Sequence, residues 1–209
     1  MSRLVLAGRS SSHFTRLARI FAIESGRDFD FELLEDLAST NAENYSGNPS
    51  LTIPVLLVDD QAVLGSVNIC RKFAELSGQR AHYSLPEDFI GSQLLQNAHE
   101  LVMTGMSAQV TIVFSTLFAG IAKENGLVMK SHERLNGLLA WLNTNWQEIL
   151  AQLSQGKLST IEVGLFCLLE HIDFRGTEGI FVGRELQEFV TNFGARQSAK
   201  DTPFKMDFT

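Results

Sequence analysis

The chain has 209 residues, of which 44% are hydrophobic and 20% are charged, as in ordinary globular proteins. This length is enough for one large domain or two small ones. The formal net charge is −7 and no block rich in Lys and Arg occurs, which argues against nucleic acid or an anionic membrane as the main partner.

Three further features bear on the cellular compartment. The N-terminal residues do not show a charged region followed by a sustained apolar core, so we expect no signal peptide. The richest apolar run, residues 106–122, is interrupted by polar residues and is expected to be a buried helix, not a membrane span. Cys70 and Cys167 each lie in an apolar helical pattern, which indicates free thiols in a reducing compartment. The cytoplasm is therefore expected.

The first third of the chain begins with a strand, a helix and a second strand. Residues 4–7 are an apolar strand, and Gly8 with the polar run that follows makes a loop. Apolar residues then recur at helical spacing until Gly26. Residues 28–33 alternate between acidic and apolar, as in a strand. This order within about 30 residues is typical of a βαβ unit with parallel strands.

The stretch from residue 48 to residue 74 predicts two more strands and a helix. Pro54 opens the aliphatic strand 55–58, where its missing amide hydrogen need not interrupt the ladder. An acidic two-residue turn returns the chain in a strand that ends at Gly65. Ser66 can then cap an amphipathic helix that stops at Gly78. The predicted order is βαβ followed by ββα.

A polar segment, residues 79–86, ends at Pro86 and is interpreted as a linker. It separates an α/β domain, residues 1–78, from a domain at residues 87–209 in which only helical periods occur.

Four helices are predicted after the linker. A long one starts at Pro86 or Glu87 and runs to about Phe118, with Gly91 and Gly105 as possible bends, and a second carries an apolar stripe from Leu135 to Leu150. A third begins at Ser159, where Ser-Thr-Ile-Glu is a capping box, and the last covers residues 184–193.

The order of these signals resembles the glutathione S-transferase family. The resemblance rests on Asn48-Pro49, on Ile53-Pro54 before an apolar strand, and on Gly65-Ser66 opening a helix. The box at Ser159 is similar to the Ser/Thr-x-x-Asp box of the central helix in the C-terminal domain of that family. The resemblance implies a thioredoxin-like N-terminal α/β domain (βαβ-ββα) followed by an all-α C-terminal domain, which is the glutathione S-transferase fold.

The same resemblance implies a glutathione site. In the family, the proline equivalent to Pro54 has a cis peptide bond, and the backbone of the preceding residue, here Ile53, pairs with the cysteinyl part of glutathione, in the manner of strand addition. Gly65 and Ser66 are implied to hold the γ-glutamyl carboxylate, since the N-terminus of a helix favours an anion. An ordinary trans proline and a plain helix cap are the alternative interpretations.

A hydroxyl at the start of the first helix is the candidate activating group. The run from Ser12 to Arg19 resembles the family pattern Ser-Pro-Phe-x-Arg-x-x-Arg, which implies that Ser12 stabilises the glutathione thiolate, with Ser11 and Ser10 as alternates. A thiol titrates at about 8.5, and a hydroxyl donor with the helix dipole lowers that pKa. Serine in place of cysteine implies no covalent intermediate. Each serine can instead be only an N-cap.

The second substrate is expected against the long helix, where Met103, Met106 and Val110 are candidates for a pocket wall or, alternatively, for the core. The histidines do not show metal-ligand spacing, so no metal site is predicted.

The function implied by the resemblance is conjugation of the glutathione thiolate to a small hydrophobic electrophile, by a cytoplasmic homodimer that needs no metal. One alternative is a non-catalytic or regulatory binding protein with the same fold. It is favoured by Gly65, where the family usually has Glu or Gln, and by Thr52, where many members have Lys or Arg. Another is a glutathione-dependent peroxidase or isomerase.

Overall fold

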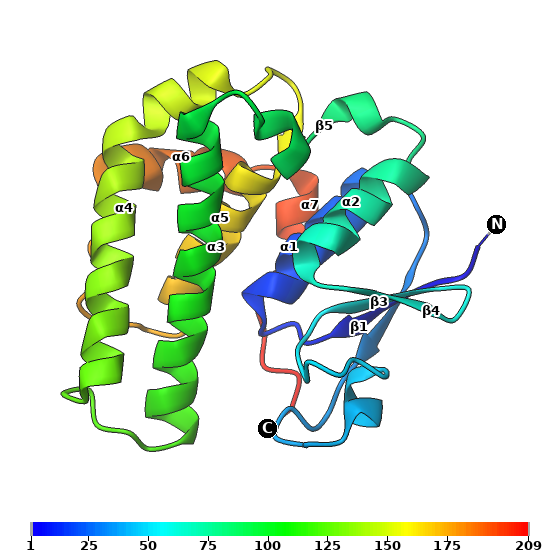
Figure 1. The fold of residues 1–209 in the computed structure, drawn as a ribbon, viewed down its shortest axis with the longest axis horizontal. Coiled ribbons are helices and arrows are strands. Elements are labelled where there is room, and N and C mark those ends of the chain that lie inside the picture. The colour runs from blue at the N-terminus through cyan, green and yellow to red at the C-terminus, as the bar shows by residue number, and fades with distance from the viewer. Residues whose placement is uncertain (1, 209) are drawn as a thin grey trace. The chain divides into compact units, whose positions relative to one another are not determined.

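The computed structural model describes residues 2–208, which form two compact units (Figure 1). The first unit comprises residues 2–83 together with residues 196–208, and the second comprises residues 84–195. The first boundary falls within the expected linker at residues 79–86. The second boundary was not expected: residues 196–208 belong to the α/β unit, whereas the sequence assigned them to the helical domain.

A four-stranded mixed sheet forms the centre of the first unit (Figure 1). Its strands are β1 (Leu4–Gly8), β2 (Asp30–Leu33), β3 (Val55–Val58) and β4 (Gln61–Leu64), in the spatial order β2-β1-β3-β4. β1 is parallel to β2 and antiparallel to β3, and β3 is antiparallel to β4. The helix α1 (His13–Glu24) links the two parallel strands. The predicted βαβ-ββα order is confirmed.

The acidic turn between β3 and β4 is a two-residue hairpin. Asp59 and Asp60 both have positive φ, 47° and 67°, as a type I′ turn requires, and aspartate tolerates this conformation better than most residues. The Asp59 carboxylate also accepts a hydrogen bond from the Arg3 amide at 2.9 Å. Hydrogen bonds from the Ser2 side chain and the Arg3 backbone lower the pKa of Asp59. This turn fixes the register in which β4 returns to the end of the sheet where β3 began.

The helix α2 (Ser66–Leu76) follows β4 and buries one face, which includes Ile69 and Phe73 at the predicted positions. Cys70 on this helix and Cys167 in the second unit are both buried, and neither is part of a disulfide within residues 2–208.

The second unit is built from four long helices, as predicted. These are α3 (Gln93–Val113), which continues as a π-helical turn (Phe114–Phe118), α4 (Gly126–Gln152), α5 (Thr160–Phe174) and α6 (Arg184–Gly194). The shorter elements of the chain are the 3-10 turns Ala42–Tyr45, Arg80–His82 and Pro86–Phe89, the two-residue strands β5 (Tyr83–Ser84) and β6 (Leu158–Ser159), and α7 (Gln197–Lys200).

The start of α3 differs from the prediction for a physical reason, and Gly105 has a packing role. The helix begins only at Gln93, because Gly91 has a φ of 100° and Ser92 provides the cap, its Oγ accepting from the Leu95 amide at 3.2 Å. Gly105 lies inside the continuous helix Gln93–Val113. A Cβ there would lie 2.8 Å from Leu168 of α5 and 3.0 Å from Leu138 of α4, so the glycine allows three helices to pack closely.

The segment Gln93–Phe118 is long and apolar enough to cross a membrane by length and composition alone, with a mean hydropathy of 1.6. The core helix of a globular protein meets the same criteria. Of the apolar 18-residue stretch within this segment, 44% is buried inside the protein. Met106, Ala108 and Ile112 are among the residues that the helix buries, as expected for the run that begins at residue 106.

The central helix α5 begins where the sequence predicts. Ser159 is the N-cap, and its Oγ accepts a hydrogen bond from the amide of Ile161 at 3.1 Å in a buried setting. Leu158 and Val163, on either side of this cap, are both buried. The apolar stripe of α4 is buried as well: Leu135, Leu138, Leu139, Leu142, Trp146 and Ile149.

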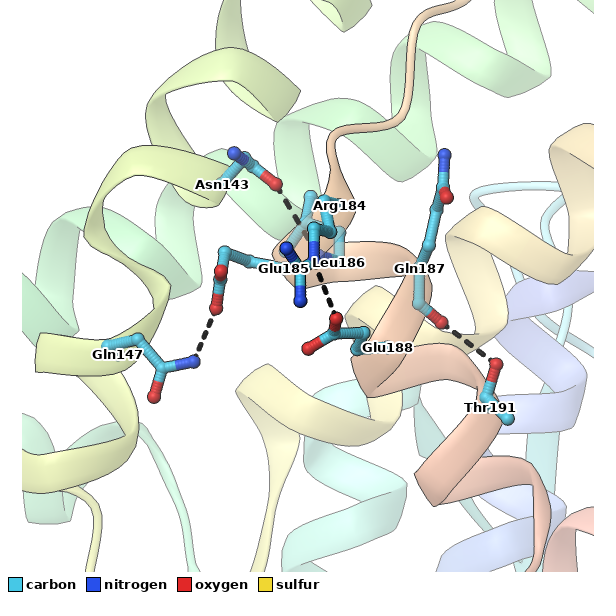
Figure 2. Close-up of polar contacts among 8 residues, drawn as sticks. All are labelled: Asn143, Gln147, Arg184, Glu185, Leu186, Gln187, Glu188 and Thr191. Atoms are coloured by element: carbon cyan, nitrogen blue, oxygen red, sulfur yellow. Dashed lines mark hydrogen bonds and ion pairs between the residues drawn. The ribbon is translucent and has the colours of Figure 1, made fainter.

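The start of α6 is held by side chains of α4 (Figure 2). Asn143 Oδ1 accepts from the amide of Leu186 at 3.4 Å, and Gln147 Nε2 donates to the carboxylate of Glu185. Gly183, the N-cap of α6, has no side chain of its own to cap the helix. A Cβ at this position would overlap the side-chain amide of Asn143. Glycine is therefore what allows α4 to cap α6.

We expect Gly183→Ala to lower the free energy of unfolding by about 1–3 kcal/mol, because the new methyl group must displace Asn143 from its capping position. Urea denaturation followed by circular dichroism measures the change. Gly137→Ala is the matched control, since a Cβ there meets nothing within 4 Å in the interior of α4, and we expect it to stabilise by up to about 1 kcal/mol. Equal stability of the Gly183→Ala variant and the wild type would contradict this account.

Candidate functional site

Three segments that are far apart in the sequence meet at one end of the sheet. β1 ends at Gly8, and its residue Ala7 lies opposite Val55, the first residue of β3. Val55 in turn lies opposite Leu64, the last residue of β4. The loop after β1, the Ile53-Pro54 pair before β3 and the Gly65-Ser66 pair after β4 are therefore neighbours, and they contain every residue predicted for the glutathione site.

Ser12 is the serine at the start of α1. It is the N-cap, and its Oγ accepts a hydrogen bond from the amide of Thr15 at 3.2 Å. Its own amide donates to the carbonyl of Arg9 at 3.1 Å, which closes residues 9–12 into a turn. The side chain is half-buried, so the cap hydroxyl is partly open to solvent at the positive end of the helix dipole. Of the three serines, Ser12 is the one that lies at the N-terminus of α1 as its cap and is also partly exposed. A thiolate would need both a hydroxyl donor and the positive helix end.

The two alternates have different surroundings. Ser11 is half-buried in the turn, whereas Ser10 is only 2% exposed. The Ser10 amide donates to Oδ2 of Asp207 at 2.6 Å. The Ser10 Oγ is buried without a hydrogen-bond partner among the described residues. Ser10 is thus covered by the C-terminal segment, a contact that the sequence did not predict.

Two arginines, Arg9 and Arg16, lie near this turn. Arg9 donates to the carbonyls of Leu34 and Glu35, and its guanidinium lies 4.5 Å from the centre of the Phe208 ring. Arg16 is only 3% exposed. Both therefore hold parts of the α/β unit together next to the candidate site.

The Ile53–Pro54 peptide bond, immediately before β3, is cis. Ile53 is half-buried, and its backbone N–H and C=O make no hydrogen bond with any of residues 2–208. Its side chain packs with Leu64 against a small core formed by Ala7, Leu34 and Val55. The side chain is fixed by packing, and the backbone polar groups remain available to a ligand that adds as a strand.

Asn48 shapes the loop that leads to Ile53. It is 1% exposed, and its Nδ2 donates to the Thr52 carbonyl at 2.7 Å and to the Thr52 hydroxyl at 3.2 Å. Its Oδ1 accepts from the amide and the hydroxyl of Ser50 at 3.0 and 2.8 Å. One buried amide side chain therefore satisfies both sides of the turn. The sequence singled out Asn48 as part of the family pattern but did not predict this role.

The helix α2 starts differently from the prediction. Gly65, not Ser66, is the N-cap, with φ 84° and ψ 132°, and it makes no side-chain capping bond. The positive φ explains glycine at a place where the family usually has Glu or Gln, because a residue with a Cβ is strained there. Ser66 is the first helical residue and is 7% exposed. A carboxylate at this helix end would meet backbone amides of the first turn.

The three residues predicted for the second-substrate pocket lie on α3 in the helical unit. Met106 is fully buried and packs in the core. Met103 and Val110 are half-buried, so of the three only these keep exposed surface. No group of three or more His, Cys, Asp or Glu side chains that could hold a metal ion occurs within residues 2–208.

Comparison with known families matches one part of the chain. Residues 11–76 match the family described as "Glutathione S-transferase, N-terminal domain". No curated protein matches the chain significantly in sequence.

Solved structures match over nearly the whole chain. A glutathione S-transferase from Methylobacillus flagellatus with glutathione bound is 18% identical, with a TM-score of 0.77 over 96% of this chain and 98% of the other. One from Methylobacterium radiotolerans in complex with glutathione sulfonate is 17% identical, with a TM-score of 0.76 over 99% and 98%. The Tau class enzyme of mango is 19% identical, with a TM-score of 0.73 over 96% and 92%. Residues 11–76 therefore match a glutathione S-transferase N-terminal domain, and the chain has the fold of glutathione S-transferases.

The Asn48 network makes a stability prediction. We expect Asn48→Ala to lower the free energy of unfolding by about 1–2 kcal/mol, because the Asn48 side chain, which is 1% exposed, loses its hydrogen bonds to Thr52 and Ser50. Thermal unfolding monitored by calorimetry tests this. Asn44→Ala, at an exposed position in the neighbouring turn, is the control and should leave stability within about 0.5 kcal/mol of the wild type. A loss of the same size in both variants would show that the network is unimportant.

Gly65 allows a second test. Gly65→Ala is expected to cost about 1–2 kcal/mol of stability, because alanine is strained at a φ of 84° although its Cβ would meet nothing closer than 3.9 Å. Gly126→Ala is the control, since position 126 has open space and no positive φ. Chemical denaturation of both variants gives the difference, and no loss in the Gly65→Ala variant relative to this control would argue against backbone strain.

Proposed function

We propose that this protein binds glutathione at the end of the sheet formed by residues 9–12, 53–54 and 65–66, and transfers its thiolate to a small hydrophobic electrophile. The observation that carries the proposal is the convergence there of two helix N-termini and a backbone edge without internal partners. The glutathione and glutathione sulfonate present in the two bacterial structures support the choice of ligand.

Each part of glutathione has a counterpart in this arrangement. The cysteinyl part, an extended peptide unit, pairs with the amide and carbonyl of Ile53. The γ-glutamyl carboxylate lies at the N-terminus of α2, where Ser66 and the first-turn amides are donors and the helix dipole favours negative charge. Thr52 and Gly65 supply no charged side chain, so the backbone does most of the binding in this protein.

Ser12 supplies the chemistry in this proposal. The thiol of glutathione is brought to the N-terminus of α1, where the Ser12 hydroxyl donates a hydrogen bond to the sulfur while its oxygen continues to accept from Thr15. A donor and the positive helix end favour the thiolate over the thiol, which raises the concentration of the nucleophile near neutral pH. The thiol proton passes to solvent, and the thiolate attacks the electrophile directly: a C–S bond forms and, with an aryl halide, the C–halogen bond breaks and halide leaves with its electron pair, with no covalent intermediate on the protein.

The proposal also includes a site for the electrophile, an oligomeric state and a cellular compartment. The electrophile is bound against α3, where Met103 and Val110 offer adaptable apolar surface. The protein acts as a homodimer in the cytoplasm, which size-exclusion chromatography with light scattering and fractionation of cells would test.

Replacement of Ser12 tests the catalytic role. We expect Ser12→Ala to lower kcat/KM for glutathione conjugation with an aryl halide by roughly tenfold to a hundredfold at neutral pH, because the bound thiol loses its donor and its pKa rises toward about 8.5. The rate of the variant should recover as the pH approaches that value. An equal rate for variant and wild type at all pH values would remove Ser12 from the mechanism.

Two further variants separate the cap from the chemistry. Ser12→Ala also loses the cap of α1, which costs about 1 kcal/mol of stability. Ser12→Asp retains a good cap but places a negative charge beside the thiolate, so it should be stable and slow. Ser12→Thr keeps both the cap and the donor, and should restore most of the rate. Calorimetric titration that detects no heat with glutathione at roughly millimolar concentration would contradict the proposed function itself.

A further inference from the structure

The last residues of the chain return to the N-terminus of α1. After α7, residues 203–208 form no helix or strand, yet they reach the turn at residues 9–12 (Figure 1). The amide of Ser10 donates to Asp207 Oδ2 at 2.6 Å, across 197 positions of sequence. This is a short, charge-assisted hydrogen bond, of the stronger kind found in proteins.

Two aromatic side chains attach the same segment to arginines of the turn and of α1. The guanidinium of Arg16 lies 4.5 Å from the centre of the Phe204 ring, and that of Arg9 lies 4.5 Å from the centre of the Phe208 ring. Asp207 lies between the two aromatic positions. The C-terminal segment is therefore attached on both sides of the bond to Ser10, by one contact at a buried arginine and one at a half-buried arginine.

The first part of the C-terminal stretch is held more firmly. Arg16 donates to the carbonyl of Ala199 at 3.2 Å and to the hydroxyl of Thr202 at 3.5 Å, and Thr202 is fully buried. Ser198 donates to the carboxylate of Glu24 at 2.6 Å. These contacts fix α7 against α1. Residues 203–208 are therefore a short segment without helix or strand that follows a fixed helix.

Asp207 places a negative charge near the N-terminus of α1. The proposed function places the glutathione thiolate at the same helix end. Ser10 and Ser12 are two residues apart, which is at most about 7 Å, and the Ser12 amide closes the turn onto Arg9. The Asp207 carboxylate, bound to the Ser10 amide, adds negative charge beside this turn, and a nearby like charge disfavours a second anion. Two polar atoms at this contact, Ser10 Oγ and Asp207 Oδ1, are buried without a hydrogen-bond partner among residues 2–208.

We infer that residues 203–208 are an autoinhibitory latch, in which the Asp207 carboxylate occupies the end of α1 and must leave before glutathione binds as the thiolate. The inference rests on the proposed function, since it assigns the regulation of that same site. Release breaks the bond from Ser10 to Asp207 and frees Arg9 and Arg16 from Phe208 and Phe204, while α7 stays in place.

Asp207→Asn tests the latch. The variant keeps the size of the side chain but removes its charge, so we expect glutathione to bind roughly tenfold more tightly than to the wild type in calorimetric titration. A chain that ends at Pro203 should bind at least as tightly as Asp207→Asn. Asp201→Asn, at an exposed carboxylate in the same stretch, changes the net charge by the same amount and should leave the dissociation constant unchanged.

Hydrogen exchange followed by mass spectrometry adds a second measurement. Glutathione should speed exchange in residues 203–208 of the wild type, because the ligand displaces them, and Asp207→Asn alone should speed exchange at the Ser10 amide by roughly tenfold. Slower exchange of residues 203–208 with ligand would overturn the inference.

The two proposals fail in different ways. If glutathione binds the wild type, Asp207→Asn and the shortened chain equally well, the latch is disproved and the proposed function stands. If none of these proteins binds glutathione, the proposed function fails and the latch fails with it.

Discussion

The buried guanidinium of Arg16 is the constraint on which the α/β unit and its candidate site depend. A charge removed from water must be surrounded by polar partners, and here they come from the other end of the chain, as the Ala199 carbonyl and the Thr202 hydroxyl. The Phe204 ring adds a favourable face for the cation. Because Arg16 is part of α1, placing its charge also fixes the helix whose N-terminus carries Ser12. The position of the C-terminal stretch and the geometry of the candidate site are thus coupled.

The candidate site itself follows from strand pairing. Antiparallel pairing of β1 with β3 and of β3 with β4 brings the end of β1, the start of β3 and the end of β4 to one edge. The supporting groups are of two kinds, backbone groups held by packing at Ile53 and helix ends capped by Ser12 and by Gly65. A site built mainly from backbone needs few particular side chains. This is consistent with a chain that keeps the fold at 17–19% identity to the bacterial and plant structures.

Glycines decide how closely the helices of the second unit approach one another. Gly105 and Gly164 lie where a Cβ would come within 2.8 Å of a side chain on a facing helix, and Gly183 admits the Asn143 amide to the start of α6. Helical periodicity marks such positions only as gaps in an apolar stripe. The same gap is compatible with a bend, which is why Gly105 was a possible bend in the sequence, whereas in the structure it packs α3 against α4 and α5.

The sequence by itself determined the elements whose causes are local. Alternation, helical periods and caps predicted the βαβ-ββα order, the hairpin at Asp59 and Asp60, and the start of α5 at Ser159, because each depends on residues within a few positions of one another. Tertiary structure decided what depends on contacts between distant residues. It assigned the cap of α2 to Gly65, placed Met106 in the core, gave Asn48 its buried network and brought Asp207 to Ser10. Short-range patterns carry no information about a partner 197 residues away, and only the folded chain sets that contact.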